Sequence, residues 1–368
     1  MIYLIILIPL LLYACIWTYF ILGCMKKPIS SYEEIGNDLR LSIVIPFRNE
    51  RDRIGPLLSC LDQLNTSGFE LNIFFIDDHS EDGGKEFLNL WKKETNKCVQ
   101  IIELEKSIEF GKKRAIKRGV DQSNDDWIFI LDADSTISID FLQEFKKEII
   151  YNKDVYLLPV VEESSGFLLS VVESYMLSII SFASANNNQP ILSNGTGMII
   201  KRSLFLQLDP YEGNYHIASG DDLFLLEKIK KEVPYRLHPL RKKKLIVHTA
   251  SPKTYSKMLN RSIRWAGKMN RSNLHFTKVV GLIVILCNYS ILLTFVFQLY
   301  ENTFKVITGI IALKFFFDLI LFLIAVNFYG SRKLIIKTPI VFLLYPLHLL
   351  FVMINLMIRR KVWKGRKI

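Results

Sequence analysis

Four long apolar blocks divide this chain into membrane-like and soluble segments. They cover residues 2–22, 279–299, 306–326 and 340–358. Each block is close to the ~20 apolar residues that a helix needs to cross a bilayer. The pattern therefore predicts an N-terminal transmembrane anchor over residues 1–24, a soluble domain over 25–278, and a C-terminal membrane domain with a basic tail over 279–368.

Between the first two blocks, short apolar runs alternate with longer amphipathic ones. The short runs, rich in Ile, Val, Leu, Phe or Tyr, predict strands at residues 41–46, 71–77, 99–104, 127–132 and 156–161. The amphipathic runs predict helices at residues 54–64, 85–95, 112–121 and 139–151. This alternation is typical of an α/β fold with a mostly parallel sheet and crossover helices. Ligands of such sheets bind beyond the carboxyl ends of the strands, so we expect the site there.

The composition narrows the class of protein. The chain has 368 residues, of which 50% are hydrophobic, and 47 Lys and Arg against 36 Asp and Glu give a net charge of +11. These values exclude a disordered chain and a purely soluble domain. The five cysteines show no paired spacing, which argues against a disulfide framework and a zinc site. Basic residues concentrate ahead of the second apolar block, where they are typical of binding to anionic membrane lipids, and we expect no nucleic-acid partner.

The distribution of positive charge predicts the orientation. Lys26 and Lys27 follow the first block, so the positive-inside rule predicts an outside N-terminus and a cytoplasmic soluble domain in an integral protein of the cell membrane. If all four blocks cross, the basic tail at 359–367 lies outside, against that rule. Either the last block, with Pro346 and His348 near its middle, forms a hairpin or re-entrant segment, or the third block does not cross. We predict a cytoplasmic C-terminus.

Two further apolar features have alternative interpretations. Residues 166–185 contain Glu173 and several serines, so we favour a helix in the membrane interface or against the domain over a fifth span. Lys314 and Asp318 lie four residues apart in the third block and would form an ion pair on one helix face. That pair would either line a path for an acceptor headgroup or hold helices together, with neither interpretation favoured.

A pair of carboxylates follows the fourth predicted strand, in the sequence Asp132-Ala133-Asp134. Hard oxygen ligands at this spacing suit Mg²⁺ or Mn²⁺. Asp is also common at strand ends for turn and capping reasons, so the motif alone is a weak indication of a metal site.

Six motifs occur in order along the predicted soluble domain. They are residues 42–50 (Ser-Ile-Val-Ile-Pro-Phe-Arg-Asn-Glu), 75–83 (Phe-Ile-Asp-Asp-His-Ser-Glu-Asp-Gly), 111–115 (Gly-Lys-Lys-Arg-Ala), Asp132-Ala133-Asp134, Gly220-Asp221-Asp222 and 261–265 (Arg-Ser-Ile-Arg-Trp). Together they resemble the family 2 glycosyltransferases, which have a GT-A fold and take a nucleotide-sugar donor. The resemblance extends from residue 41 to residue 268, and the flanking apolar blocks are similar to the membrane-integrated branch of that family.

The resemblance implies which residues surround the donor. Pro46 and Glu50 would lie beside the nucleoside, and Asp78 would accept a hydrogen bond from the uracil ring of a UDP-sugar. Lys112, at the start of a predicted helix, would face phosphate or ribose together with the helix N-terminus. The alternatives are that Asp77 and Asp78 cap the next helix and that Lys112 is a solvated surface residue.

Other motif residues would carry out the transfer. The resemblance implies that Asp132 and Asp134 hold Mg²⁺ or Mn²⁺ on the diphosphate, and that Asp222 removes the proton of the acceptor hydroxyl. One base and one in-line displacement predict inversion at the anomeric carbon. Asp222 would also be a suitable N-cap for a helix over residues 223–231.

Residues 261–265 complete the implied site. The Arg264 guanidinium suits a departing diphosphate oxygen, and the Trp265 indole would form a wall of the sugar or acceptor pocket. Arg261 stands where the family frequently has Gln, and we expect it to contact the donor. Since processive synthases of long polymers usually keep that Gln, the departure favours transfer of a single sugar.

The sequence therefore predicts a metal-dependent inverting glycosyltransferase of the hexosyl- or N-acetylhexosaminyltransferase class. It would move one sugar from a nucleotide-sugar, implied to be a UDP-sugar, to a lipid-linked or amphipathic acceptor at the cytoplasmic membrane face. The alternatives are a processive polysaccharide synthase with the same donor site and, less favoured, a non-catalytic membrane scaffold with a degenerate donor fold.

Overall fold

The computed structural model describes residues 2–26, 38–105, 110–215, 217, 220–271, 273–298, 304–358, 362–363 and 366–367. The chain folds into two compact units. Unit 1 comprises Met1–Lys27, Glu162–Leu192 and Ser251–Lys361, and unit 2 comprises Pro28–Val161, Ser193–Ala250 and Val362–Ile368. This division differs from the sequence-based one, because residues 162–192 and 251–278 group with the apolar helices.

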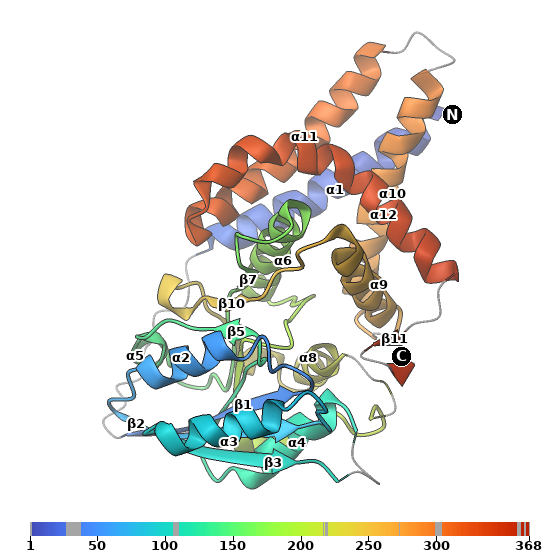
Figure 1. Ribbon diagram of the computed structural model, residues 1–368. Helices are drawn as coiled ribbons and strands as arrows, with labels where there is room; N and C mark the ends of the chain where they lie inside the picture. Colours follow the sequence, from blue (N-terminus) through green and yellow to red (C-terminus); the bar gives the residue numbers. More distant parts are fainter. Residues whose placement is uncertain are drawn as a thin grey trace. The chain divides into compact units, whose positions relative to one another are not determined.

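A seven-stranded sheet forms the centre of unit 2, in the order β3-β2-β1-β4-β8-β6-β9 (Figure 1). The strands are β1 (Leu39–Phe47), β2 (Phe69–Asp77), β3 (Cys98–Glu103), β4 (Trp127–Ile130), β6 (Val155–Leu157), β8 (Met198–Lys201) and β9 (Leu237–Pro239). β1 pairs in parallel with β2 and β4, and β2 pairs in parallel with β3. β8 runs antiparallel between β4 and β6. The predicted α/β fold with a mostly parallel sheet is confirmed.

The predicted strand at residues 156–161 is two strands in the structure. β6 ends at Leu157, and β7 (Val160–Glu162) begins after Pro159 and joins β10 (Val247–Thr249) and β5 (Ser135–Thr136) in a second sheet. Proline has no backbone N–H to donate to a ladder, which separates the two runs. The Pro159 carbonyl still accepts a hydrogen bond from the Val247 amide at 2.9 Å.

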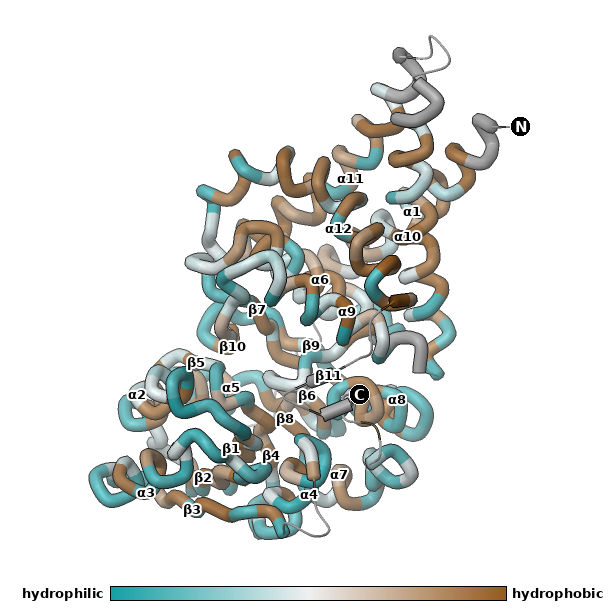
Figure 2. Tube along the Cα trace, turned by 45° about the vertical axis from the view of Figure 1, so that its right-hand side comes forward, coloured by the Kyte–Doolittle hydropathy of each residue, from teal (hydrophilic) through white to brown (hydrophobic). Residues whose placement is uncertain are grey.

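Four helices of unit 2 occur near their predicted ranges, with the shortest ending earlier than expected. They are α2 (Gly55–Gln63), α3 (Gly84–Glu94), α4 (Lys112–Gln122) and α5 (Phe141–Lys147). In Figure 2 the strands of this sheet are mainly hydrophobic, whereas the helices around them carry many hydrophilic residues. On α4, a Cβ added to Gly119 would lie 2.5 Å from Val44 Cγ1 of β1. This glycine therefore permits the close helix–sheet contact that fixes the start of α4 at the sheet edge.

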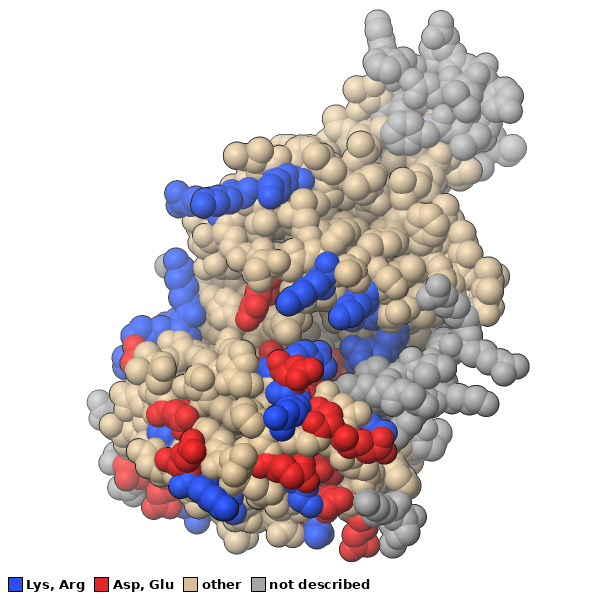
Figure 3. Space-filling model, viewed as in Figure 1, with Lys and Arg blue, Asp and Glu red and all other residues tan. Residues whose placement is uncertain are grey.

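Unit 1 is built mainly from long helices. They are α1 (Ile2–Met25), α6 (Leu168–Asn186), α9 (Tyr255–Arg271), α10 (His275–Gln298), α11 (Phe304–Tyr329) and α12 (Thr338–Ile358). All except α9 are long and apolar enough to cross a membrane. The surface of these apolar helices is largely uncharged in Figure 3, whereas acidic and basic side chains intermix on unit 2. The predicted N-terminal and C-terminal apolar helices of a membrane protein are thus confirmed.

The apolar helix α6 has both of its ends on one side of any bilayer. β4 precedes α6 and β8 follows it, and these two strands are hydrogen-bonded, with Trp127 opposite Lys201. A sheet in water cannot have a bilayer between two of its paired strands, so a single crossing by α6 is excluded. Most residues of α6 are buried. The pairing supports the predicted placement at the interface or against other parts of the protein.

A buried polar cluster joins two of the apolar helices. Lys314 Nζ and Asp318 Oδ2 on α11 lie 2.5 Å apart, and their side chains are 6% and 4% exposed. Tyr13 of α1 donates a hydrogen bond to Asp318. The two charges are enclosed, and Tyr13 on another helix is a third partner. The pair therefore fits a role in holding helices together better than a role in lining a path for an acceptor headgroup.

The last apolar block is one continuous helix. α12 runs from Thr338 to Ile358 with Pro346 inside it. Apolar helices tolerate an internal proline when neighbouring groups satisfy the freed backbone. The alternative of a hairpin within this block is therefore wrong. Most of the basic tail on which the predicted cytoplasmic C-terminus depends lies outside the described residues.

Candidate active site

Acidic loops leave the sheet of unit 2 at one edge. β1 ends at Phe47, which pairs with Asp77 at the end of β2, and β4 ends at Ile130, which pairs with Val44. Parallel strands in this register direct their following loops to the same side of the fold. The loops carry Glu50, Asp78 and the Asp132-Ala133-Asp134 motif.

Lys112 is the centre of a polar cluster at this edge. Its Nζ lies 2.6 Å from Asp132 Oδ1 and 3.0 Å from Asp221 Oδ2. It also donates a hydrogen bond to the Gly195 carbonyl at 3.1 Å. A Cβ added to Gly195 would lie 2.6 Å from Lys112 Nζ and 2.7 Å from Asp221 Oδ2, so glycine leaves room for the cluster. Three segments far apart in the sequence therefore meet at one ammonium group.

The environment of Lys112 keeps it charged. Burial alone would lower its pKa, but the nearby carboxylates of Asp132 and Asp221 outweigh that effect and raise the pKa above its ordinary value. The side chain is only 19% exposed. The alternative of a solvated surface lysine is therefore wrong, and the ammonium is a fixed positive charge beside the acidic motif.

Asp134 lies in an excess of negative charge. Burial raises its pKa to about 6, with further contributions from the charges of Asp132 and Glu50, against the opposing effect of Arg53 and Lys112. Arg53 Nη2 lies 2.5 Å from Glu50 Oε2, and Arg53 Nη1 lies 3.4 Å from Asp134 Oδ2. The carboxylates of Asp132, Asp134 and Glu50 thus lie close enough to interact, and a bound cation would relieve their mutual repulsion.

The carboxylates fit a divalent metal that is held partly by substrate. Among the described residues, no three His, Cys, Asp or Glu side chains come close enough to form a metal cage. Mg²⁺ and Mn²⁺ commonly take only one or two carboxylates from a protein, and complete their shells with substrate phosphates and water. Asp132 and Asp134 supply such a pair, and the contact of Asp132 with the Lys112 ammonium shows that its carboxylate already faces a cation.

Asp222 lies in the first turn of α8 (Asp221–Glu232). The helix starts earlier than predicted, after Gly220 with φ of 94°, so Asp222 is not its N-cap residue. Its Oδ1 accepts a hydrogen bond from the Leu223 amide at 2.9 Å, and its carbonyl accepts one from Ser193 Oγ at 3.0 Å. The neighbouring Asp221 contacts Lys112, which connects this turn to the Asp132 loop.

Asp77 and Asp78 do not cap the helix that follows them. Asp77 Oδ1 accepts a hydrogen bond from the Ser80 amide at 2.9 Å, and Asp78 Oδ1 accepts one from the Gly111 amide at 3.0 Å. It is Asp82 that binds the first amide of α3, at Gly84. Burial raises the pKa of Asp78, while the Gly111 hydrogen bond and the charge of Arg48 act against that rise. The capping alternative for this pair is therefore wrong.

The remaining predicted residues lie on α9, in unit 1. Arg264 and Trp265 occupy its middle, one turn after Arg261. Arg261 forms ion pairs with Glu162 and with Glu173, the latter at 2.9 Å. Its guanidinium carbon also lies 4.3 Å from the centroid of the Trp265 ring. Arg261, Arg264 and Trp265 thus belong to unit 1, whereas the carboxylates of Asp132 and Asp134 belong to unit 2.

Several polar residues of the clusters were not predicted. Asp221 stands inside the Gly-Asp-Asp motif, but the sequence favoured its neighbour as the reactive group. Thr196 accepts a hydrogen bond from the Asp132 amide at 3.1 Å, and its position between Gly195 and Gly197 is a turn signal that could have indicated it. Glu162 lies in an apolar run, and no signal in the sequence distinguishes it.

Comparisons with known proteins add to this geometry. The family model described as Glycosyl transferase family group 2 matches residues 127–357, more than half of the chain. The chain belongs to the family 2 glycosyltransferases. A second model of this glycosyltransferase family, described as Glycosyl transferase family 2, matches residues 42–205. No match was found among curated proteins.

Solved structures of glycosyltransferases resemble this chain to different degrees. The mannosyltransferase PcManGT from Pyrobaculum calidifontis, in complex with GDP-Man and Mn²⁺, aligns with a TM-score of 0.59 at 12% identity over 97% of this chain and 99% of its own. The S. aureus TarS fragment 1–349 aligns with a TM-score of 0.42 at 18% identity, over 68% of this chain and 70% of the fragment. M. tuberculosis glucosyl-3-phosphoglycerate synthase aligns with a TM-score of 0.39 at 13% identity, over 59% of this chain and 72% of its own. Because the identity with PcManGT is only 12%, this match shows the fold alone, and it confirms the predicted GT-A fold.

Proposed function

We propose that this glycosyltransferase moves a single sugar from a nucleotide-sugar to a lipid-linked or amphipathic acceptor, with inversion at the anomeric carbon. The observation that carries the proposal is the Lys112 cluster, which joins the Asp132 loop to the turn bearing Asp222. Such a transfer must neutralise the leaving diphosphate while it deprotonates the acceptor hydroxyl, and the joined segments carry groups for both tasks. The GDP-Man and Mn²⁺ in the PcManGT complex support a nucleotide-sugar donor and a divalent metal.

The nucleoside of the donor is assigned to Pro46, Glu50 and Asp78, as the family resemblance implies. The Asp78 carboxylate is 3% exposed and bound to the Gly111 amide, which fixes it beside the start of α4. Lys112 follows directly in the chain. We expect its ammonium to exchange part of its contact with Asp132 for a donor phosphate, because both partners are anions.

The metal is assigned to Asp132 and Asp134. When bound, Mg²⁺ or Mn²⁺ supplies positive charge to the diphosphate. Arg53 holds Glu50 and approaches Asp134, so it keeps these carboxylates from repelling one another before a cation arrives. Lys112 does the same for Asp132.

The base is assigned to Asp222 rather than to Asp221. Asp221 is 6% exposed, and its Oδ2 lies 3.0 Å from the Lys112 ammonium, so this carboxylate is already engaged within the protein. Asp222 is less buried than Asp221, and its Oδ1 accepts a hydrogen bond from the Leu223 amide. It would receive the acceptor proton as the hydroxyl oxygen attacks, and one base acting in one displacement gives inversion.

The acceptor and the orientation are proposed from the membrane helices. Long apolar helices bring a lipid-linked acceptor within the protein's reach, and the positive-inside rule puts the transfer on the cytoplasmic face of the cell membrane. Arg264 and Trp265 keep the roles that the family motif implies, at the leaving diphosphate and the sugar or acceptor.

Release of nucleoside diphosphate tests the proposal. The detergent-purified protein is supplied with UDP-, GDP- and dTDP-sugars in turn, Mn²⁺ or Mg²⁺, and a native lipid extract. We expect release from one donor that requires both metal and lipid, with a product that carries one added sugar. A polymeric product would favour the processive synthase, and absence of both release and donor binding would favour the scaffold. Asp140→Asn, which removes an exposed ion pair with Lys244, is the matched control for Asp222→Asn.

A further inference from the structure

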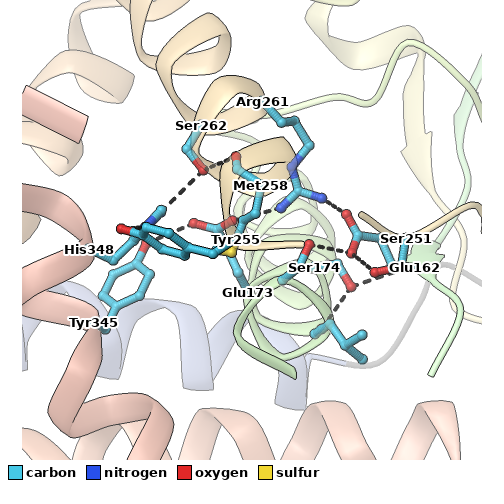
Figure 4. A network of polar contacts seen from close by, with 12 residues as sticks. Glu162, Glu173, Ser174, Ser251, Tyr255, Met258, Arg261, Ser262, Tyr345 and His348 are labelled. Carbon is cyan, nitrogen blue, oxygen red and sulfur yellow. Dashed lines mark hydrogen bonds and ion pairs between the residues drawn. The ribbon is translucent and has the colours of Figure 1, made fainter. Parts of the chain in front are cut away.

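A second charged cluster lies wholly within unit 1. Figure 4 shows Arg261 of α9 reaching the carboxylates of Glu162 and Glu173. The Arg261 side chain is 11% exposed, and the two glutamates are 5% and 8% exposed. Each end of the guanidinium faces a carboxylate of the protein, so its hydrogen-bonding fork is already engaged. Arg261 therefore does not have the free fork that direct binding of a donor diphosphate requires.

Both glutamates are themselves held in place. Glu162 Oε2 accepts hydrogen bonds from Ser170 Oγ at 2.6 Å and from Ser251 Oγ at 2.7 Å. Glu173 Oε1 accepts one from the Tyr345 hydroxyl of α12 at 3.2 Å. These contacts come from separate segments of unit 1 (Figure 4). The two carboxylates consequently form a fixed frame for the guanidinium.

The Trp265 indole depends on the same guanidinium. The Arg261 guanidinium carbon lies 4.3 Å from the centroid of the Trp265 ring, within the range of a cation–π contact. The two residues are one helical turn apart, where side chains of an α-helix are neighbours. Displacement of the guanidinium would therefore free the indole to change its orientation.

α12 is attached to α9 by further contacts. His348 Nε2 lies 3.2 Å from Ser262 Oγ, and His348 Nδ1 lies 3.3 Å from the Tyr255 hydroxyl. Leu259 and Ile263 of α9 also pack against Val352 of α12 in a small hydrophobic cluster. The face of α9 that carries Leu259, Ser262 and Ile263 is thus held against α12.

We propose that Arg261 is a positioning residue for Trp265, and that Glu162, Glu173 and Tyr345 hold it in place. The glutamates orient the guanidinium, the guanidinium orients the indole, and Tyr345 anchors this chain of contacts on α12. The inference rests on the proposed function, in which Trp265 contacts sugar or acceptor. It replaces the sequence-based expectation that Arg261 contacts the donor itself.

A double-mutant cycle on donor turnover tests the positioning role. Glu173→Gln removes one charge from the frame and keeps its shape, so we expect kcat/KM to fall about tenfold in the otherwise wild-type protein. In a Trp265→Ala background, where there is no indole to orient, the same substitution should lower kcat/KM less than about twofold. Tyr345→Phe is the milder second variant, and its smaller effect should also disappear in the Trp265→Ala background.

Glu148→Gln is the matched control. Glu148 is also a buried glutamate with a basic partner, Lys242 at 2.7 Å, but it lies in unit 2, outside the network around Arg261. We expect its loss to leave kcat/KM unchanged in both backgrounds. Equal losses from Glu173→Gln with and without Trp265, or the same loss from Glu148→Gln, would overturn the positioning role, because both results indicate general destabilisation.

Fluorescence provides a readout that needs no activity. The emission of Trp265 is obtained as the difference between each protein and its Trp265→Phe counterpart. We expect Glu173→Gln to shift this emission to longer wavelength, because a released indole meets more water; an unchanged difference spectrum would refute the inference. If the wild type turns over no donor, the proposed function fails, and the fluorescence result still decides whether Arg261 positions Trp265.

Discussion

Two clusters in this protein each place one basic side chain between two carboxylates, and they differ in what surrounds them. Lys112 lies at the end of the sheet, where the side chain of one partner, Asp132, is 32% exposed and that of the other, Asp221, is 7% exposed. Arg261 lies among helices, with both of its glutamate partners below 10% exposure. Exposed carboxylates can exchange a protein cation for a ligand, whereas enclosed ones cannot without a large desolvation cost. The arrangement around Lys112 therefore suits the binding of a ligand, and the arrangement around Arg261 suits the orientation of a neighbouring side chain.

Additional charge sharpens the contrast. Beside the Lys112 cluster, Asp134 and Glu50 add two more carboxylates, both of which pair with Arg53. Beside the Arg261 cluster, the side chains that donate hydrogen bonds to the two glutamates carry neutral hydroxyls, on Ser170, Ser251 and Tyr345. An excess of negative charge indicates a place for a further cation, and neutral donors indicate a closed network.

The largest effect should come from the proposed base. Asp222→Asn keeps the size and most hydrogen bonds of the side chain but cannot take a proton, so we expect turnover to fall about 10²- to 10⁴-fold with donor binding retained. Initial rates and donor affinity are measured on the same preparation, with Asp140→Asn as control. An Asp222→Asn protein of full activity would exclude Asp222 as the base.

The two basic side chains should differ in their effect on stability. Arg261→Met leaves two buried carboxylates without their cation and should cost about 3–5 kcal/mol. Lys112→Met leaves one buried carboxylate, Asp221, without its cation, whereas the other, Asp132, can reach water, so we expect a smaller cost of about 2 kcal/mol. Thermal unfolding in detergent compares the two midpoints, and the comparison fails if Lys112→Met lowers the midpoint as much as Arg261→Met.

Acid should weaken binding at the Lys112 cluster through Asp134. Its pKa is raised to about 6, so the carboxylate takes up a proton as pH falls through that value and can no longer hold a metal. From pH 7 to pH 5 we expect Mn²⁺-dependent donor affinity to fall about tenfold. Calorimetric titration over this range provides the measurement; an affinity that is independent of pH would contradict the assignment of Asp134 to the metal.

The smallest effect should come from substitution of Gly195, the glycine next to the Lys112 ammonium. In Gly195→Ala the new methyl group meets the ends of the Lys112 and Asp221 side chains, which can move aside, so we expect a stability loss below ~1 kcal/mol. Because the displaced ammonium no longer bridges Asp132 and Asp221, donor turnover should fall about fivefold. A variant that unfolds, or that retains full turnover, would disagree with this description of the bridge.

The sequence was most informative where local pattern and local structure coincide. The parallel strands and their helices could be predicted because apolar runs and amphipathic runs alternate at regular intervals. The acidic loops could be predicted to share an edge because parallel strands end together. The long apolar helices could be predicted from length and hydropathy alone.

Contacts between distant segments could not be predicted in this way. The bridge from Lys112 to Asp221 depends on the close approach of Gly195, which is more than 70 residues from Lys112 in the chain. The partners of Arg261 come from a strand end and from α6, and neither Glu162 nor Glu173 forms a recognisable motif with it. The role expected for Arg261 came from the motif around it, whereas its contacts are set by packing within unit 1.

Metal-dependent binding of the donor tests the central claim most directly. Isothermal titration of the nucleotide-sugar that the release assay identifies is carried out with the wild type, Asp134→Asn and the Asp140→Asn control, each with and without Mn²⁺. The account predicts that Mn²⁺ strengthens donor binding by the wild type and by Asp140→Asn, and that Asp134→Asn loses this effect. Donor binding that is equally strong without Mn²⁺, or unchanged in Asp134→Asn, would contradict it.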